Sequence, residues 1–258
     1  MGRIISISNQ KGGGGKTTTA VNLAASLAVA EHEVLLVDFD PQGNATSGVG
    51  LPKGEDGATS YEVLLGSVNP TDALKDTELP HLKVIPADQR LAGAEIELVD
   101  EEGREAYLKR ALDPIRDRYE FILLDTPPSL GLLTLNALTA SQSVLIPIQC
   151  EYYALEGLSQ LLNTIHLVQR KLNPELRIEG VLLTMFDQRL RLSNQVAQEA
   201  VEYFGDTVYK TVIPRNVTLG ESPSFGKPVI LHDIQSRGSQ CYLQLAEEVL
   251  RHGQACVG

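Results

Sequence analysis

The sequence predicts an α/β fold: a doubly wound, mostly parallel β-sheet with helices on both faces. Short, fully apolar runs recur along the chain, as in strands that are buried on both sides of a sheet. Segments with helical periodicity separate these runs, and this alternation is typical of βαβ units. A glycine-rich turn joins the first run to the first helical segment. Such sheets bind ligands at the carboxyl ends of their strands, where this turn would lie.

The individual elements follow from the apolar periodicity. We expect strands at Arg3–Ser8, Val34–Val37, Leu82–Ile85, Phe121–Leu124, Val144–Ile148, Val181–Leu183 and Val208–Ile213. We expect helices from Lys16 to about Ala28 and at Gly93–Arg116, Leu132–Ala140, Leu155–Lys171, Leu192–Phe204 and Gly238–Arg251. The motifs described below all fall at the carboxyl ends of expected strands.

Length and composition limit the class of protein. A chain of 258 residues with 43% hydrophobic content suits one domain, residues 1–258, around a single core. The net charge of −11 repels nucleic acid and anionic membranes on average, so DNA binding would need a local basic patch. No run approaches the roughly 18 apolar residues of a membrane span, and the first residues lack a signal-peptide layout. Cys150, Cys241 and Cys256 are too widely spaced for a disulfide framework or a metal cluster. Together, these observations predict a soluble, cytoplasmic protein that does not bind membranes.

The segment after the first expected strand has the composition of a phosphate-binding loop. Four consecutive glycines, Gly12 to Gly15, leave no side chains between the backbone and a phosphate, and a helix follows directly. Lys16 would place its charge on the β- and γ-phosphates, and the hydroxyl of Thr17 would bind Mg²⁺. The sequence therefore predicts a Mg-ATP site in a sheet of the P-loop NTPase type.

Lys11 marks a variant of this loop. The general pattern has glycine six residues before the lysine, where this chain has Gln10 followed by Lys11. The loop resembles the deviant Walker A motif, although valine usually occupies the place of Gly14. The resemblance implies a homodimer in which Lys11 crosses the interface and contacts the partner's nucleotide. By this resemblance the nucleotide-binding residues of the loop are Lys11, Gly12, Gly13, Gly14, Gly15, Lys16, Thr17 and Thr18.

Aspartates follow two of the expected strands. Asp38 and Asp40 come after Leu35–Val37, and Asp125 comes directly after Phe121–Leu124. A carboxylate placed in this way near a P-loop usually touches Mg²⁺, directly or through water, and orients the nucleophile. Asp38 could equally be structural.

Both segments resemble motifs of the same superfamily, Walker A′ around Asp40 and Walker B around Asp125. The resemblance implies that Asp40 positions the attacking water. It also implies that Thr17, Asp40 and Asp125 form the magnesium site. The expected catalytic residues are therefore Lys11, Lys16 and Asp40.

Three further segments resemble the ParA/Soj branch of chromosome- and plasmid-partition ATPases, and with the motifs above they extend the resemblance over essentially the whole chain. They are Gln149–Gly157, Ile213–Asn216 and Ser222–Pro228. In this family the Pro-Arg-Asn segment borders the adenine. The resemblance therefore makes Pro214 and Asn216 candidates for contacts with the base.

The family also binds DNA without sequence preference, through basic residues on the ATP-bound dimer. The resemblance makes Arg189, Arg191 and Lys227 the candidate DNA contacts. Position 218 is threonine, where relatives commonly carry a DNA-contacting arginine. Because such contacts go to phosphates, we expect DNA binding to weaken as the salt concentration rises.

The resemblance implies an ATP-dependent DNA-segregation protein with weak, Mg-dependent ATPase activity. Its ATP-bound sandwich dimer would bind nucleoid DNA and be released when a ParB-like partner stimulates hydrolysis. One alternative is a relative that positions another cellular cargo on the nucleoid. A second is a MinD-like switch at the membrane surface, which would need a basic amphipathic C-terminal helix. The mixed charge of 245–253 argues against that second alternative.

Overall fold

The computed structural model describes residues 2–54, 57–151 and 154–255, and it is built around a seven-stranded sheet in the order β3-β4-β2-β5-β1-β6-β7. The strands are β1 (Arg3–Ile7), β2 (Val34–Asp38), β3 (Lys75–Asp76), β4 (Leu82–Ile85), β5 (Phe121–Asp125), β6 (Ser143–Gln149) and β7 (Arg177–Thr184). Neighbouring strands are parallel except β3, which pairs antiparallel with β4 at one edge. The predicted doubly wound, mostly parallel sheet is confirmed.

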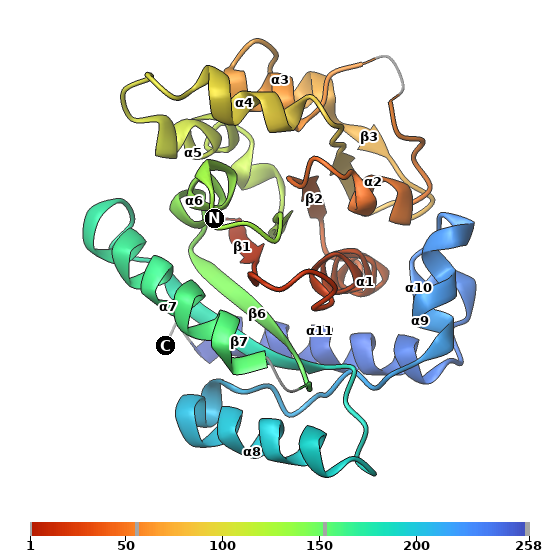
Figure 1. Ribbon diagram of the computed structural model, residues 1–258. Helices are drawn as coiled ribbons and strands as arrows, with labels where there is room; N and C mark the ends of the chain where they lie inside the picture. The colour runs from red at the N-terminus through yellow and green to blue at the C-terminus, as the bar shows by residue number, and fades with distance from the viewer. Residues whose placement is uncertain (1, 55–56, 152–153, 256–258) are drawn as a thin grey trace.

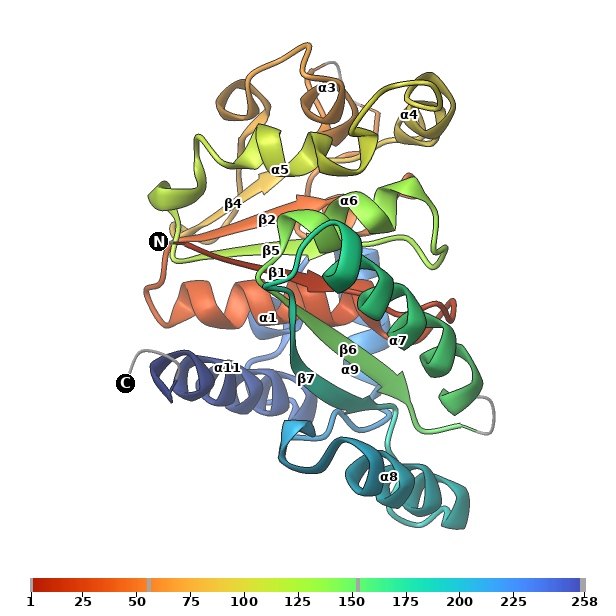
Figure 2. The ribbon, with the colours of Figure 1, turned by 90° about the vertical axis from the view of Figure 1, so that its left-hand side faces the viewer.

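Helices cover both faces of this sheet (Figure 1). They are α1 (Lys16–Val29), α2 (Asn44–Gly48), α3 (Ser60–Leu65), α4 (Leu91–Glu97), α5 (Tyr107–Leu112), α6 (Leu132–Ala140), α7 (Ala154–Lys171), α8 (Arg191–Phe204), α9 (Val217–Glu221), α10 (Val229–His232) and α11 (Arg237–Ala255). The 3₁₀ turns of the described residues are η1 (Pro70–Ala73), η2 (Arg104–Ala106), η3 (Arg116–Arg118), η4 (Gly205–Thr207) and η5 (Ser222–Phe225). Figure 2 shows α3, α4 and α5 above strands β2, β4 and β5, with α1 and α11 below them.

Alternate residues of the central strands enter opposite cores, because successive side chains of a strand point to opposite faces. In β1, Ile5 and Ile7 pack with residues of α1 and α11. Ile4 packs instead with residues of α3, α4, α5 and α6. A third cluster fills the space between β6, β7 and the helices α7 and α8. Since both faces are covered, the central strands β2 and β5 are apolar up to their last residues, Asp38 and Asp125, which is the pattern that predicted them.

The predicted strand at Val208–Ile213 is wrong. This segment forms one isolated bridge to β7, between Val181 and Val208, and its backbone donates to β7 from Tyr209 N to Val181 O at 3.0 Å and from Ile213 N to Leu183 O at 2.8 Å. The backbone N–H groups of Lys210 and Thr211, which lie in the middle of the segment, donate to the carboxylate of Glu248 on α11 at 2.9 and 2.8 Å. Because those two donors are turned toward a helix, a continuous ladder with β7 does not form.

The predicted helix at Gly93–Arg116 is also wrong, since the structure divides it into α4, η2, α5 and η3. Gly103 takes a left-handed φ of 66° at the start of η2, which interrupts the helical path. The side chain of Asn136 then holds the second piece, accepting a hydrogen bond from Leu108 N and donating one to Arg104 O. Periodicity missed β3 and the short helices α2, α3, α9 and α10, which have too few residues to show a repeat.

Gly180 of β7 offers a test of core packing. A Cβ atom placed on Gly180 would lie 2.3 Å from Cε2 of the buried Tyr209 ring, so the ring would have to move. We expect Gly180→Ala to lower the free energy of unfolding by about 1–3 kcal/mol, as overpacking usually does. Urea denaturation measures the change. Gly93→Ala is the matched control, because its closest new contact is the flexible Glu97 side chain at 3.4 Å; equal loss in both variants would contradict the packing explanation.

Candidate active site

The glycine-rich loop joins β1 to α1 with a backbone that needs glycine at two positions. Gly13 has φ 73° and Gly15 has φ 88°, in the left-handed region that other residues rarely adopt. Gly15 is also the N-cap of α1, and no side chain caps this helix within the described loop. The first N–H groups of α1 therefore remain available to an anion.

Gly14 differs from these two glycines. A Cβ atom at this position would lie 3.3 Å from Asn9 Nδ2 and 3.3 Å from Lys11 O, a tight but adjustable fit. The Gly14 carbonyl accepts a hydrogen bond from Thr184 Oγ1 at 3.1 Å, which connects the loop to the end of β7. The position therefore tolerates a side chain, unlike Gly13 and Gly15.

Lys16 points into the site from the first turn of α1. Its side chain is buried, and its Nζ donates to Lys11 O at 3.2 Å. Burial lowers the pKa of this ammonium, while the charges of Asp125 and Asp40 oppose the shift. The structure thus brings together the predicted lysine and both predicted carboxylates.

Asp125 is a fully buried carboxylate without a normal hydrogen bond. It ends β5 and lies in register with Asp38 of β2. Neither of its carboxylate oxygens has a hydrogen-bond partner among the described residues, although the Thr17 hydroxyl is close enough to lower its pKa. Burial, followed by the charge of Asp38, holds the pKa of Asp125 well above its usual value. Unpaired carboxylate oxygens beside a hydroxyl are hard donors of the kind that Mg²⁺ prefers, so these residues fit that ion.

Asp38 has a structural role in this arrangement. Its Oδ2 accepts hydrogen bonds from both the backbone N and the Oγ1 of Thr46, each at 2.7 Å. The same Oγ1 accepts a hydrogen bond from Ala87 N at 3.0 Å. Asp38 thereby fixes α2 against the end of β2. Burial raises the pKa of Asp38 to about 6.

Asp40 lies in a tight turn directly after β2. Its own N–H donates to Asp38 Oδ1 at 3.3 Å, and its Oδ1 accepts from Gln42 N at 2.9 Å. The turn closes with Gly43 N donating to Asp40 O at 2.9 Å. This turn holds the Asp40 carboxylate, only 6% exposed, on the side of the site that faces Lys16 and Asp125.

A cavity of about 200 Å³ adjoins the loop. Its walls are Gly15, Thr18, Thr184, Met185, Ile213, Pro214, Arg215, Asn216, Leu219, Gly220 and Tyr242. The structure therefore places the predicted Pro214 and Asn216 beside the phosphate loop. Asn216 Oδ1 accepts a hydrogen bond from Leu219 N at 3.0 Å, which caps α9 and orients the amide.

Sequence reasoning missed several residues of this cavity. Met185 has a φ of 51°, an uncommon conformation for a residue with a side chain. Tyr242 comes from α11 and shares a 3.3 Å hydrogen bond with Thr19 of α1. Neither residue belongs to a recognisable motif, and only the packing of α11 and β7 brings them to the loop.

Lys11 lies on the outer side of the loop. Its Nζ is 3.5 Å from Glu151 Oε2, and the same carboxylate binds Arg215 at 2.9 Å. Sequence reasoning did not single out Glu151 as a partner of Lys11. Within the predicted segment Gln149–Gly157, Tyr152 and Tyr153 lie outside the described residues, as does Cys256 elsewhere in the chain.

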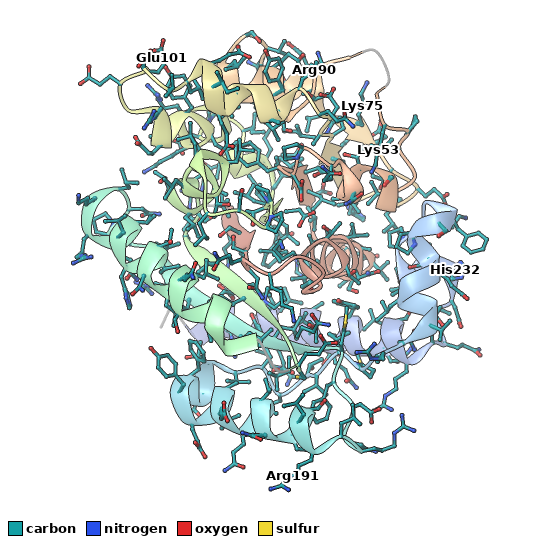
Figure 3. All side chains as sticks on the ribbon, viewed as in Figure 1. Lys53, Lys75, Arg90, Glu101, Arg191 and His232 are labelled. Carbon is teal, nitrogen blue, oxygen red and sulfur yellow. The ribbon has the colours of Figure 1, made fainter. Side chains whose placement is uncertain are left out.

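The predicted DNA contacts fall in two places. Arg191 begins α8 and Arg189 lies in the turn just before it, and Figure 3 shows Arg191 at the lower end of the molecule. Lys227 lies between η5 and α10 and pairs with Glu78 at 3.3 Å. Arg189 binds the Asp187 carboxylate through Nε at 2.9 Å and a terminal nitrogen at 2.7 Å. These hydrogen bonds lower the pKa of Asp187 to about 2, and they occupy part of the Arg189 guanidinium.

Comparison with known proteins places this geometry in a family. A family model described as an AAA domain matches residues 2–178. The chain is 60% identical to the sporulation initiation inhibitor protein Soj of Bacillus subtilis over 253 residues, covering 98% of this chain and 100% of Soj. It is 57% identical to the chromosome partitioning protein ParA of Myxococcus xanthus over 251 residues, covering 97% and 89%.

A solved structure shows the same fold with nucleotide. The protein titled cobyrinic acid a,c-diamide synthase from Mycobacterium smegmatis, bound to an ATP analog and magnesium, is 38% identical. The match covers 98% of this chain and 96% of that one, with a TM-score of 0.87. Across the described part of this chain, no helix has the length and apolar content to cross a bilayer.

The loop geometry predicts opposite outcomes for neighbouring glycines. We expect Gly15→Ala to weaken ATP binding by about five- to thirtyfold, because alanine at φ 88° is strained by roughly 1–2 kcal/mol, although its Cβ would make only ordinary contact with Thr184 at 3.4 Å. The Gly14→Ala variant should bind ATP with an affinity within about threefold of that of wild type, since the Asn9 side chain can move away from the added Cβ. Titration with a fluorescent ATP analogue measures both affinities. Equal weakening of the two variants would contradict the backbone explanation.

The buried Asp38 predicts a dependence of stability on pH. Because its pKa is about 6 in the folded protein, against an ordinary value of 3.8, the folded state holds this proton more tightly. The contribution of this bound proton to the free energy of unfolding is complete below about pH 4. It is lost as the pH rises to about 6 and beyond. The difference between the two pKa values corresponds to a change of about 3 kcal/mol in the free energy of unfolding.

Asp38→Asn removes this titration. We expect the nucleotide-free wild type, in EDTA, to lose more stability than the variant between about pH 4 and pH 7. Urea unfolding across that range provides the measurement. Parallel pH profiles for the two proteins would show that Asp38 does not bind a proton in this way.

Proposed function

The chain belongs to the ParA/Soj family of partition ATPases, and we propose that it is an ATP-switched DNA-segregation protein. In this proposal residues 1–258 act as one P-loop ATPase domain. The ATP-bound homodimer binds DNA without sequence preference, and hydrolysis to ADP and phosphate, stimulated by a ParB-like partner, releases it. The protein then works at the nucleoid without binding membranes.

The single observation that carries the ATPase part is the arrangement around Asp125. A buried carboxylate with no hydrogen-bond partner is costly, yet here it ends a central strand next to Thr17 and Lys16. Mg²⁺ bound by Thr17, Asp125 and Asp40 would neutralise this charge and orient the phosphates. The relative solved with an ATP analog and magnesium supports this assignment.

The remaining residues of the loop take the nucleotide. The backbone of Gly12, Gly13, Gly14 and Gly15, together with Thr18, would hold the phosphates, and Lys16 would place its ammonium on them. Pro214 and Asn216 would contact the adenine in the adjoining cavity. Asn216 Oδ1 is engaged by Leu219, so its amide N–H₂ is the group that would face the base.

Asp40 would position the attacking water. Its carboxylate is held in a short turn by backbone hydrogen bonds. Catalysis in this site would come from positioning and charge stabilisation. Basal turnover is therefore expected to be weak until a partner completes the geometry.

Lys11 is suited to act on a second protomer. Its side chain is 31% exposed, and its ion pair with Glu151 is long at 3.5 Å. Exposed pairs of this kind contribute little, roughly 0–1 kcal/mol. Lys11 can therefore leave Glu151 and reach the partner's nucleotide at low cost, which makes ATP part of the dimer interface.

DNA binding would rest on Arg191, Arg189 and Lys227. Arg191 is exposed at the start of α8, where no ion pair holds it among the described residues. Arg189 and Lys227 each pair with a carboxylate, Asp187 and Glu78. We therefore propose Arg191 as the main contact. The pairing of Arg189 with Asp187 and the threonine at position 218 favour one alternative, in which the same ATPase positions another cargo.

The DNA-segregation proposal is tested by DNA binding with ATP, with ADP and without nucleotide. We expect binding only with ATP, with an affinity that falls as the salt concentration rises. Arg191→Ala should reduce the affinity more than Arg189→Ala, and Asp187→Asn should raise it by releasing Arg189. Gel shifts with a duplex of arbitrary sequence measure all three variants.

Lys16→Ala is the control variant, which should not form the ATP-bound dimer. It should therefore not bind DNA under any condition. If ATP-bound wild type fails to bind DNA at low salt, the DNA-segregation proposal is wrong. The ATPase assignment would then stand by itself, with the chain acting on another cargo.

A further inference from the structure

We propose that Lys53 is a positioning residue for ATP hydrolysis, because it holds the turn that carries Asp40. This inference rests on the proposed function of Asp40 and adds a residue outside every motif of the chain. Lys53 follows α2 and lies 13 positions beyond Asp40 in the sequence. The fold returns it to the same turn.

Lys53 spans that turn with two hydrogen bonds. Its Nζ donates to Gln42 O at 2.7 Å and to Asn44 Oδ1 at 2.8 Å. The N–H of the same Gln42 donates to Asp40 Oδ1 at 2.9 Å. One residue therefore connects the ammonium of Lys53 to the carboxylate of Asp40, so that a shift of Gln42 would move the catalytic group.

The opposite side of the turn lies against the backbone of the segment after β4. Gly43 has φ 59°, and a Cβ atom placed on it would lie 2.8 Å from Ala87 O and 3.7 Å from Lys53 Cδ. The turn is thus enclosed between the segment after β4 and the stem of Lys53. Ala87 is itself held by Thr46, which binds Asp38. Backbone atoms form this side, so the Lys53 side chain is the part of the enclosure that a substitution can remove.

The partners of Lys53 distinguish it from its neighbours. It lines a surface hollow of about 600 Å³ together with Pro41, Gln42, Gly54, Gly57, Asp88, Gln89 and Arg90. In this hollow Arg90 pairs with the carboxylates of Asp88 and Glu62. Both recorded partners of Lys53 are instead uncharged oxygens of the Asp40 turn. Its hydrogen bonds therefore act on the turn itself.

Lys53 is exposed, which separates a positioning role from a role in folding. Figure 3 shows Lys53 on the same upper side of the molecule as Lys75 and Arg90. Substitutions at exposed positions usually change stability little. A variant without the ammonium should therefore fold and bind ATP while losing the alignment of Asp40.

The test compares Lys53→Met with wild type. We expect single-turnover ATP hydrolysis to slow by roughly tenfold, because small misplacements of a catalytic group can cost up to about 10²-fold. The affinity for a fluorescent ATP analogue and the melting temperature should stay unchanged. Lys53→Arg retains a cationic donor and should recover most of the rate. Lys75→Met is the matched control, since Lys75 has no recorded hydrogen bond to Gln42, Gly43 or Asn44 within the described residues.

The Asp40→Ala variant distinguishes a failure of the proposed role of Asp40 from a failure of the inference on Lys53. If Asp40→Ala hydrolyses ATP at the wild-type rate, the proposed role of Asp40 is wrong. If Asp40→Ala is inactive but Lys53→Met hydrolyses normally, the inference on Lys53 alone is overturned. An arginine variant as slow as the methionine variant, or a parallel loss of ATP binding and thermal stability, would likewise rule out positioning by hydrogen bonds.

Discussion

The site is organised around an uncompensated negative charge at the carboxyl edge of the sheet. Asp38 and Asp125 end adjacent strands in register, both fully buried, and Asp40 follows two residues after Asp38. Only Asp38 has a full set of hydrogen bonds, from Thr46 and Asp40. Charge in such surroundings is expensive to leave unpaired, so the folded protein is prepared for a cation. Lys16 supplies part of that compensation, and Mg²⁺ fits the remainder.

Much of the surrounding structure serves to hold these carboxylates. The two cores fix β2 and β5 side by side, since alternate strand residues are buried in each face. The Asp38–Thr46–Ala87 hydrogen bonds then attach α2 and the segment after β4 to the end of β2. These contacts and the hydrogen bonds of Lys53 fix the position of the Asp40 turn. The Asp40 carboxylate, although it lies on a short turn, is thus held as firmly as the ends of the strands.

The surface charge bears on the proposed binding of DNA in the ATP-bound state. With a net charge of −11 the protein as a whole repels a polyanion. Two of the three candidate DNA-binding cations are paired with carboxylates, and Arg191 is left for phosphates. One exposed arginine in each protomer is a weak site, and a dimer doubles it. Dependence on ATP for dimerisation would therefore make DNA binding dependent on ATP as well.

The sequence alone determined the class of fold, the phosphate loop and the aspartates after two strands, because these depend on local patterns. Strands buried on both faces must be apolar, and a loop that approaches phosphates must be rich in glycine. The tertiary structure decided which glycines are needed: Gly13 and Gly15, with positive φ, but not Gly14. It also decided that Val208–Ile213 is not a strand, since Glu248 takes its donors. Met185, Tyr242 and Lys53 belong to no local pattern, and only long-range packing brings them to the loop and the Asp40 turn. Glu151 lies in a predicted segment, but only the tertiary structure shows its contact with Lys11.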